Sequence, residues 1–253
     1  MSGPLSCTTD LSHPVAAVRL AGYLDATGPA AAWAAVLDCL AAEPDTVVVD
    51  VGQLVLGTDD LAPAIAALDR QAHRWPGCAL VLAGAEPAMA VRAGVRSYPS
   101  VAAARLARAD GRARDHLRET LPAAAIAAPL ARRLVERACR AWSVPDLLDP
   151  AQLVVTELVA NAVRHSDHDL AVTASLRDGD LRISVADDDP VLPRPGAAGP
   201  TDEHGRGLLM VEMISRDWGA MRLTMGKVVW ARFGRADQPR PGGRPDPYTA
   251  GAG

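Results

Sequence analysis

The chain has 253 residues, of which 49% are hydrophobic and 22% are charged, a balance typical of a soluble globular protein with one large or two ordinary domains. Its formal net charge of -4 argues against nucleic-acid and membrane binding, because such surfaces usually carry an excess of Lys and Arg. The sequence predicts neither a signal peptide nor a membrane-spanning segment, so we expect a cytoplasmic protein.

The first half alternates strand-like and helix-like segments, which predicts an α/β domain over residues 1–110. Val15–Leu24 is predicted to be a strand pair with a turn at Gly22. Short apolar runs rich in β-branched residues predict buried parallel strands. The predicted strands are Thr46–Val51 and Ala79–Ala83, and the predicted helices are Ala30–Ala42, Leu61–Arg74 and Val101–Arg108.

A charged segment with few apolar side chains, Ala109–Arg118, indicates a boundary before a second domain over residues 111–237. Here two long helices precede a mostly antiparallel sheet, an order that predicts a two-layer α/β sandwich. Its predicted helices are Pro122–Trp142, Ala151–His165 and Leu208–Ser215, and its predicted strands are Leu170–Leu176, Leu181–Ala186, Gly219–Thr224 and Val228–Phe233. Residues 238–253 are rich in Pro and Gly and are predicted to be a disordered tail.

The helix around Glu157 carries the clearest chemistry. Glu157, Asn161 and Arg164 lie four and three residues apart, so they share one face, with His165 at its edge. An amide oxygen can bind Mg²⁺, a carboxylate can orient or deprotonate a hydroxyl, and a guanidinium can bind phosphate. An ordinary solvated helix face is the alternative interpretation of the same pattern.

Three later segments favour a nucleotide site. Asp187 and Asp189 follow an apolar strand, where a carboxylate could accept a hydrogen bond from an exocyclic amine; a polar turn is the alternative. Gly205, Arg206, Gly207 and Leu208 enter a helix, where glycines allow backbone amides to approach phosphate. Lys227 begins the last strand and is the only lysine in the chain, which suggests selection for that residue, although one instance could arise by chance.

Taken in order, these segments resemble the nucleotide-binding boxes of the GHKL ATPase superfamily, and most closely those of the serine-kinase anti-sigma factors. ELVANAVRH is similar to the N-box, VADDDP to the first glycine box, HGRGL to the second, and GKVVW to the closing strand motif. The resemblance spans about Leu117 to Arg235. It implies a histidine kinase-like ATPase domain of the GHKL type that binds ATP and Mg²⁺.

The resemblance also implies a role for each matching residue. Asn161 would bind Mg²⁺, Glu157 would be the general base, and Asp187 would bind the adenine amine. Arg164 and the amides of residues 205–208 would bind phosphate, with His165 and Lys227 also at the nucleotide. Asp189 and Pro190 depart from the family's usual Gly-x-Gly, and Asp189 adds negative charge there.

The histidines suggest no separate chemistry. No helix resembling an H-box precedes the second domain, so His165, His168 and His204 are poor candidates for the phosphoacceptor of a two-component kinase. A metal pair of His165 and His168 would lack a third ligand.

The first half resembles the STAS domains of anti-sigma factor antagonists over about His13 to Arg108. In that family a strand ending in Asp leads to a turn whose serine is phosphorylated at a helix start. The corresponding turn here, Gly57–Leu61 (GTDDL), has Asp59 near the acceptor position and Thr58 as its nearby hydroxyl. Asp59 could imitate a phosphoserine or could simply be an N-cap.

Two functions from different classes remain open. One is a serine/threonine protein kinase that transfers the ATP γ-phosphate to a serine of a partner STAS protein. The other is a non-catalytic module in which ATP binding helps to sequester a sigma factor or an antagonist, with the chain's own STAS-like domain competing for that surface. A sensor-kinase fragment is a third interpretation, and the sequence leaves open whether the chain forms a homodimer.

Overall fold

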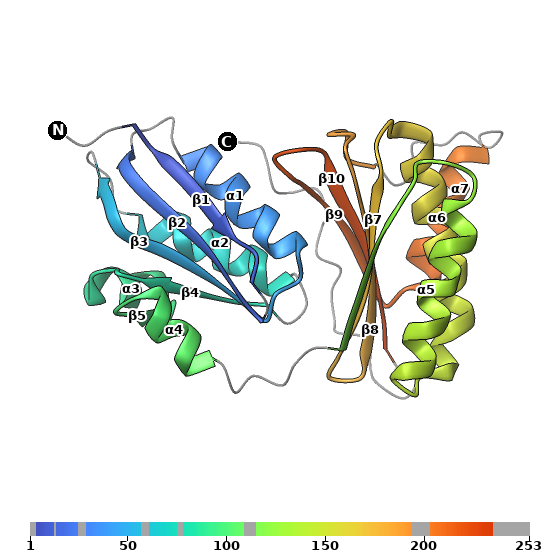
Figure 1. The fold of residues 1–253 in the computed structure, drawn as a ribbon, viewed down its shortest axis with the longest axis horizontal. Coiled ribbons are helices and arrows are strands. Elements are labelled where there is room, and N and C mark those ends of the chain that lie inside the picture. The colour runs from blue at the N-terminus through green and yellow to red at the C-terminus, as the bar shows by residue number, and fades with distance from the viewer. Residues whose placement is uncertain are drawn as a thin grey trace. The chain divides into compact units, whose positions relative to one another are not determined.

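The computed structural model describes residues 4–12, 14–24, 29–56, 61–74, 78–108, 115–193 and 203–234. The chain forms two compact units, Met1–Ala113 and Arg114–Gly253, each built on its own five-stranded sheet (Figure 1). The predicted boundary at residues 110–111 and the predicted disordered tail at 238–253 lie outside the described residues, as do Thr58 and Asp59.

The sheet of the first unit has the strand order β1-β2-β3-β4-β5. Its strands are β1 (Ser6–Asp10), β2 (Val15–Leu24), β3 (Thr46–Leu56), β4 (Ala79–Ala83) and β5 (Ser97–Tyr98). β1 is antiparallel to β2, and the other neighbours are parallel. The predicted strand pair over Val15–Leu24 is wrong, because this segment is one strand: Gly22 adopts a φ of 99° yet stays paired with Leu54 of β3.

The helices of the first unit are α1 (Pro29–Ala41), α2 (Ala62–Arg74), α3 (Pro87–Ala93) and α4 (Val101–Arg108). Helices α1, α2 and α4 pack against this sheet, and α3 packs against α2. Consecutive residues Val47, Val48 and Val49 of β3 are all fully buried, so both faces of this strand are covered, as the apolar run predicts. Ala104 of α4 packs on the face that contains Val48.

The sheet of the second unit is antiparallel throughout, with the order β6-β7-β8-β10-β9. Its strands are β6 (Asp115–Leu121), β7 (Leu170–Arg177), β8 (Asp180–Asp187), β9 (Asp217–Arg222) and β10 (Lys227–Phe233). The sequence missed β6, which is an edge strand bearing four charged or histidine side chains among its seven residues (DHLRETL). The other four strands lie where they were predicted, to within a few residues.

Three helices cover one face of this sheet, as Figure 1 shows. They are α5 (Ala127–Ala141), α6 (Leu148–His165) and α7 (Glu203–Ile214). Val155, Leu158, Val159 and Ala162 of α6 are buried in the core that these helices share with the sheet. The predicted two-layer α/β sandwich is therefore confirmed. Among the described residues, no helix has both the length and the apolar composition needed to cross a membrane.

Packing of α6 generates a first prediction. Leu158 is 3% exposed and Leu153, on the same helix, is 45% exposed. Leu158→Ala should lower the free energy of unfolding by about 2–5 kcal/mol, because it leaves a cavity in the core. The matched variant Leu153→Ala should cost less than about 1 kcal/mol. Urea denaturation followed by circular dichroism measures both, and equal losses would contradict the assigned orientation of α6.

Candidate functional site

The outward face of α6 presents the four polar side chains that the sequence singled out. Glu157 and Asn161 are half-buried, whereas Arg164 and His165 are exposed. Glu157, Asn161 and His165 occupy successive turns of the helix and therefore lie along one line. The buried stripe on the opposite side of α6 fixes the rotation of the helix, so these side chains point away from the sheet.

Glu157 lies directly against α7. A Cβ atom added at Gly207 would overlap Oε2 of Glu157 and would come within 3.4 Å of its Cδ. Only a residue without a side chain lets the carboxylate approach the helix backbone this closely. This contact brings the N-box-like helix and the second glycine box together, as the resemblance to GHKL ATPases implies.

The predicted start of α7 at Leu208 is wrong, because the helix begins at Glu203. Gly205, Arg206 and Gly207 are thus helical residues rather than a loop before the helix. The backbone N–H groups without a partner inside a helix are those of its first four residues. The amides that could meet phosphate are consequently those of residues 203–206, while Leu208 packs against the core.

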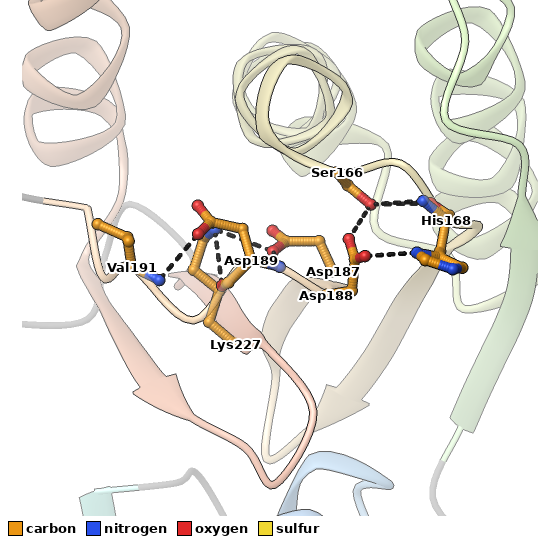
Figure 2. Close-up of polar contacts among 7 residues, drawn as sticks. All are labelled: Ser166, His168, Asp187, Asp188, Asp189, Val191 and Lys227. Carbon is orange, nitrogen blue, oxygen red and sulfur yellow. Dashed lines mark hydrogen bonds and ion pairs between the residues drawn. The ribbon is translucent and has the colours of Figure 1, made fainter.

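Lys227 and Asp187 lie directly opposite each other on neighbouring strands β10 and β8. Both belong to the face of the sheet that the helices cover, since Val229 and Val185, two residues along each strand, are core residues. Lys227 is 1% exposed, and its Nζ donates to Oδ1 of Asp187 at 2.9 Å. It also donates to Oδ2 of Asp189 at 2.7 Å and to the carbonyl oxygen of Asp189 at 3.1 Å (Figure 2).

Burial and charge act in opposite directions on the two carboxyl groups of this cluster. Burial raises the pKa of Asp187 above its ordinary value, and the hydrogen bond and charge of Lys227 only partly offset this effect. Burial also acts to raise the pKa of Asp189, but there the hydrogen bond from Lys227 and the N–H of Val191 prevail and the pKa is lowered. The amino group of Lys227 thus donates hydrogen bonds to both carboxylates.

A glycine immediately before Lys227 makes this arrangement possible. Gly226 has a φ of 89°, a conformation that other residues rarely adopt. A Cβ at this position would also overlap the carbonyl oxygen of Asp187. The turn into β10 therefore passes directly over the end of β8, which places Lys227 opposite Asp187.

The sequence analysis missed a second polar cluster beside the first. Oδ1 of Asp188 accepts a hydrogen bond from Oγ of Ser166 at 2.5 Å, and its Oδ2 lies 2.5 Å from Nδ1 of His168 (Figure 2). The hydrogen bond from Ser166 lowers the pKa of Asp188, with His168 contributing further. Because the histidine ring contacts the aspartate and not the serine, this is no nucleophile–base pair; it ties the end of α6 to the end of β8.

These contacts bring three segments around Asn161. Asn161 lies one turn of α6 after Glu157, which touches α7, and one turn before His165, next to Ser166 and its bond to the β8 end. Within the described ranges there is no group of three His, Cys, Asp or Glu side chains that could hold a metal ion. A Mg²⁺ ion that arrives with a nucleotide commonly takes most of its ligands from phosphate oxygens and water and only one or two from the protein. An amide oxygen, a carboxylate and an adjacent helix start fit Mg-ATP.

Comparison with known proteins identifies the domain. Residues 121–233 match the model of the histidine kinase-like ATPase domain. The chain belongs to the family of proteins that carry this domain, and such a domain implies ATP binding. It is also 36% identical, over 70 residues, to the uncharacterized protein SCO4941 of Streptomyces coelicolor, a match that covers 26% of this chain and 67% of that protein.

Two solved structures are also similar to the chain. One contains the RsbU and RsbW domains of Rv1364c from Mycobacterium tuberculosis, with 23% identity and a TM-score of 0.38, over 47% of this chain and 31% of that one. The other is an anti-sigma factor antagonist from Mycobacterium paratuberculosis, with 21% identity and a TM-score of 0.36, over 44% of this chain and 100% of that one. The matched part is about a third of the length of the first structure.

The contact between Glu157 and Gly207 can be tested with a double-mutant cycle. Replacing a helix-interior glycine by alanine normally stabilises a protein by about 0.5–1 kcal/mol. Gly207→Ala should stabilise by less than this amount, because the end of the flexible Glu157 side chain has to move away from the new methyl group. In a Glu157→Ala background the same substitution should be stabilising by the ordinary amount. Urea unfolding of the four proteins measures both changes, and equal changes in the two backgrounds would refute the contact.

Proposed function

We propose that the chain is an ATP-dependent regulatory protein kinase of the anti-sigma-factor type, which phosphorylates a serine on a partner STAS protein. The observation that carries this proposal is the position of Glu157. Its carboxylate lies against Gly207, the fifth residue of α7, and on the same face of α6 as Asn161, so the proposed general base and the proposed cation ligand both lie on the side of α6 that meets α7.

The binding roles follow from the chemistry of each group. Mg-ATP, when bound, supplies the γ-phosphoryl group and the positive charge that offsets its oxygens. The amide oxygen of Asn161 would hold the cation. The N–H groups of residues 203–206 would face the phosphates at the positive end of α7, together with the guanidinium group of Arg164 and the imidazole of His165. Asp187 would accept a hydrogen bond from the adenine amine, with Lys227 and Asp189 around it.

Glu157 would perform the proton transfer. As the serine hydroxyl of the partner forms its bond to the γ-phosphorus, the Glu157 carboxylate accepts the hydroxyl proton, and the bond to the β–γ bridging oxygen breaks to leave ADP. A positioned general base of this kind contributes roughly a factor of 10²–10⁴ in rate. The rest of the acceleration in phosphoryl transfer comes from positioning and charge.

The sequence of the first unit favours a phosphate-accepting serine on another chain. The turn at residues 57–61 has Asp59 near the acceptor position and no serine, so a phosphorylation cycle would require a serine in trans. One solved structure that is similar to the chain is an anti-sigma factor antagonist. A STAS-type antagonist is therefore the partner class that we propose.

One observation favours a second function, a non-catalytic module that sequesters a sigma factor or an antagonist. The apolar side chains of Leu209 and Met213 are 41% and 71% exposed on α7, one turn apart. They belong to the same helix as Gly207. Nucleotide binding at the start of this helix could thus alter a protein-binding surface without any phosphoryl transfer.

Substitution at Glu157 separates catalysis from binding. The purified chain, Mg²⁺, γ-labelled ATP and a panel of serine-containing STAS antagonists should give phosphoserine that mass spectrometry can locate. Glu157→Gln should reduce the transfer rate at least about 100-fold and change the Kd for ATP less than about threefold. Asn161→Ala should instead weaken Mg²⁺-dependent ATP binding.

A matched control is Glu136→Gln on α5, which removes a carboxylate whose partner is Arg140, 2.7 Å away on the same helix. This variant should retain the wild-type transfer rate. ATP binding without any phosphoserine on the panel, together with stable capture of one STAS protein, would replace the kinase by the sequestering module. Absence of ATP binding at millimolar magnesium would end both proposals.

A further inference from the structure

The two oxygens of the Asp187 carboxylate have different surroundings. Oδ1 accepts two hydrogen bonds, from Nζ of Lys227 at 2.9 Å and from the backbone N–H of Asp189 at 3.0 Å. Oδ2 accepts no hydrogen bond from any residue that the structure describes. One oxygen therefore has its hydrogen-bond partners within the protein, while the other keeps its capacity to accept, in a side chain that is 1% exposed.

Lys227 cannot serve the phosphates. A lysine ammonium has three N–H donors, and here all three are used, by Oδ1 of Asp187 and by the Oδ2 and carbonyl oxygens of Asp189. Lys227 therefore has no N–H donor left for a phosphate oxygen, so the influence of Lys227 on the nucleotide would act through the carboxylates that it binds.

We propose that Lys227 is a positioning residue that sets purine specificity, because together with the N–H of Asp189 it occupies Oδ1 of Asp187 and leaves Oδ2 to read the substituent at purine position 6. This inference rests on the proposed nucleotide-binding function of the same site. An oxygen that only accepts selects a 6-amino purine, which donates, over a 6-oxo purine, which accepts.

The arrangement dictates what an amide would do in place of the carboxylate. In Asp187→Asn the carbonyl oxygen must take the position of Oδ1, because two donors face that position. The NH₂ group must then take the position of Oδ2, where it donates toward the base. The substitution should therefore invert the preference from a 6-amino to a 6-oxo purine. The charge of Lys227 remains balanced in this variant, because its ion pair with Asp189 is retained.

The experiment is calorimetric titration of the full chain with ATP and with inosine triphosphate, which differ at position 6, in excess magnesium. The wild type should bind ATP at least about tenfold more tightly. Asp187→Asn should bind inosine triphosphate at least about threefold more tightly than ATP. In Asp187→Asn/Lys227→Met the amide is no longer held in one orientation, so the two Kd values should converge to within about threefold.

The chain offers a matched control on the same strand. Arg232 of β10 also pairs with two carboxylates, Asp180 at 3.3 Å and Asp217 at 3.4 Å. Asp187→Asn/Arg232→Met removes a second doubly paired cation from β10, a guanidinium whose side chain is 20% exposed, and should keep the inverted preference. This comparison separates a general loss of stability from a loss of orientation at Asp187.

A folded Asp187→Asn protein that still prefers ATP would overturn the inference, as would a double variant with Lys227→Met that keeps the inversion. If Asp187→Asn proves unfolded by circular dichroism, Lys227→Met alone decides the question. Its ratio of Kd values should approach one while that of Arg232→Met stays at the wild-type value, and an unchanged ratio in Lys227→Met would overturn the inference. A wild-type chain that binds neither nucleotide would refute the proposed function itself, whereas ATP preference without inversion would refute only the role of Lys227.

Discussion

An ammonium group taken out of water costs several kcal/mol unless charges and hydrogen bonds replace its hydration. Lys227 meets this constraint with three acceptors from one short segment, the end of β8 and the loop that follows. The constraint affects the neighbouring backbone as well as the lysine side chain. It holds β10 in register with β8, requires a glycine at position 226, and turns the carboxylate of Asp189 inward. The extra negative charge that Asp189 brings to the first glycine box is thereby compensated within the domain.

Helix α6 connects this cluster to the rest of the site. Its buried stripe anchors it in the core, and its outward face carries the groups with the chemistry. Glu157 touches α7, and one residue beyond the last turn of α6 Ser166 bonds to Asp188. A candidate catalytic group is thus attached to a rigid helix, which can hold its geometry more precisely than a loop. The first turn of α7 contributes backbone amides instead.

Strong periodicity explains what the sequence predicted. The stripe of α6 and the alternating strands β7 and β8 are recognisable because burial selects apolar residues at a fixed repeat, and β10 is recognisable as a short apolar run, VVWA. Strand β6 was missed because an edge strand has charged side chains and needs only one partner. The start of α7 was misplaced because glycines at 205 and 207 disfavour a helix locally, and the contact with Glu157 that explains Gly207 is a tertiary one. The partners of Lys227 depend on the register between β8 and β10, and no local pattern specifies that register.

A single amine in the interior has a chemical consequence. Acylating reagents that modify lysine should leave Lys227 unmodified in the folded chain, since its Nζ is buried and donates three hydrogen bonds. Attachment of a label to Lys227 would then require the separation of β8 from β10, and the labelling rate would report that separation. Labelling of this lysine would therefore measure how often the second domain opens.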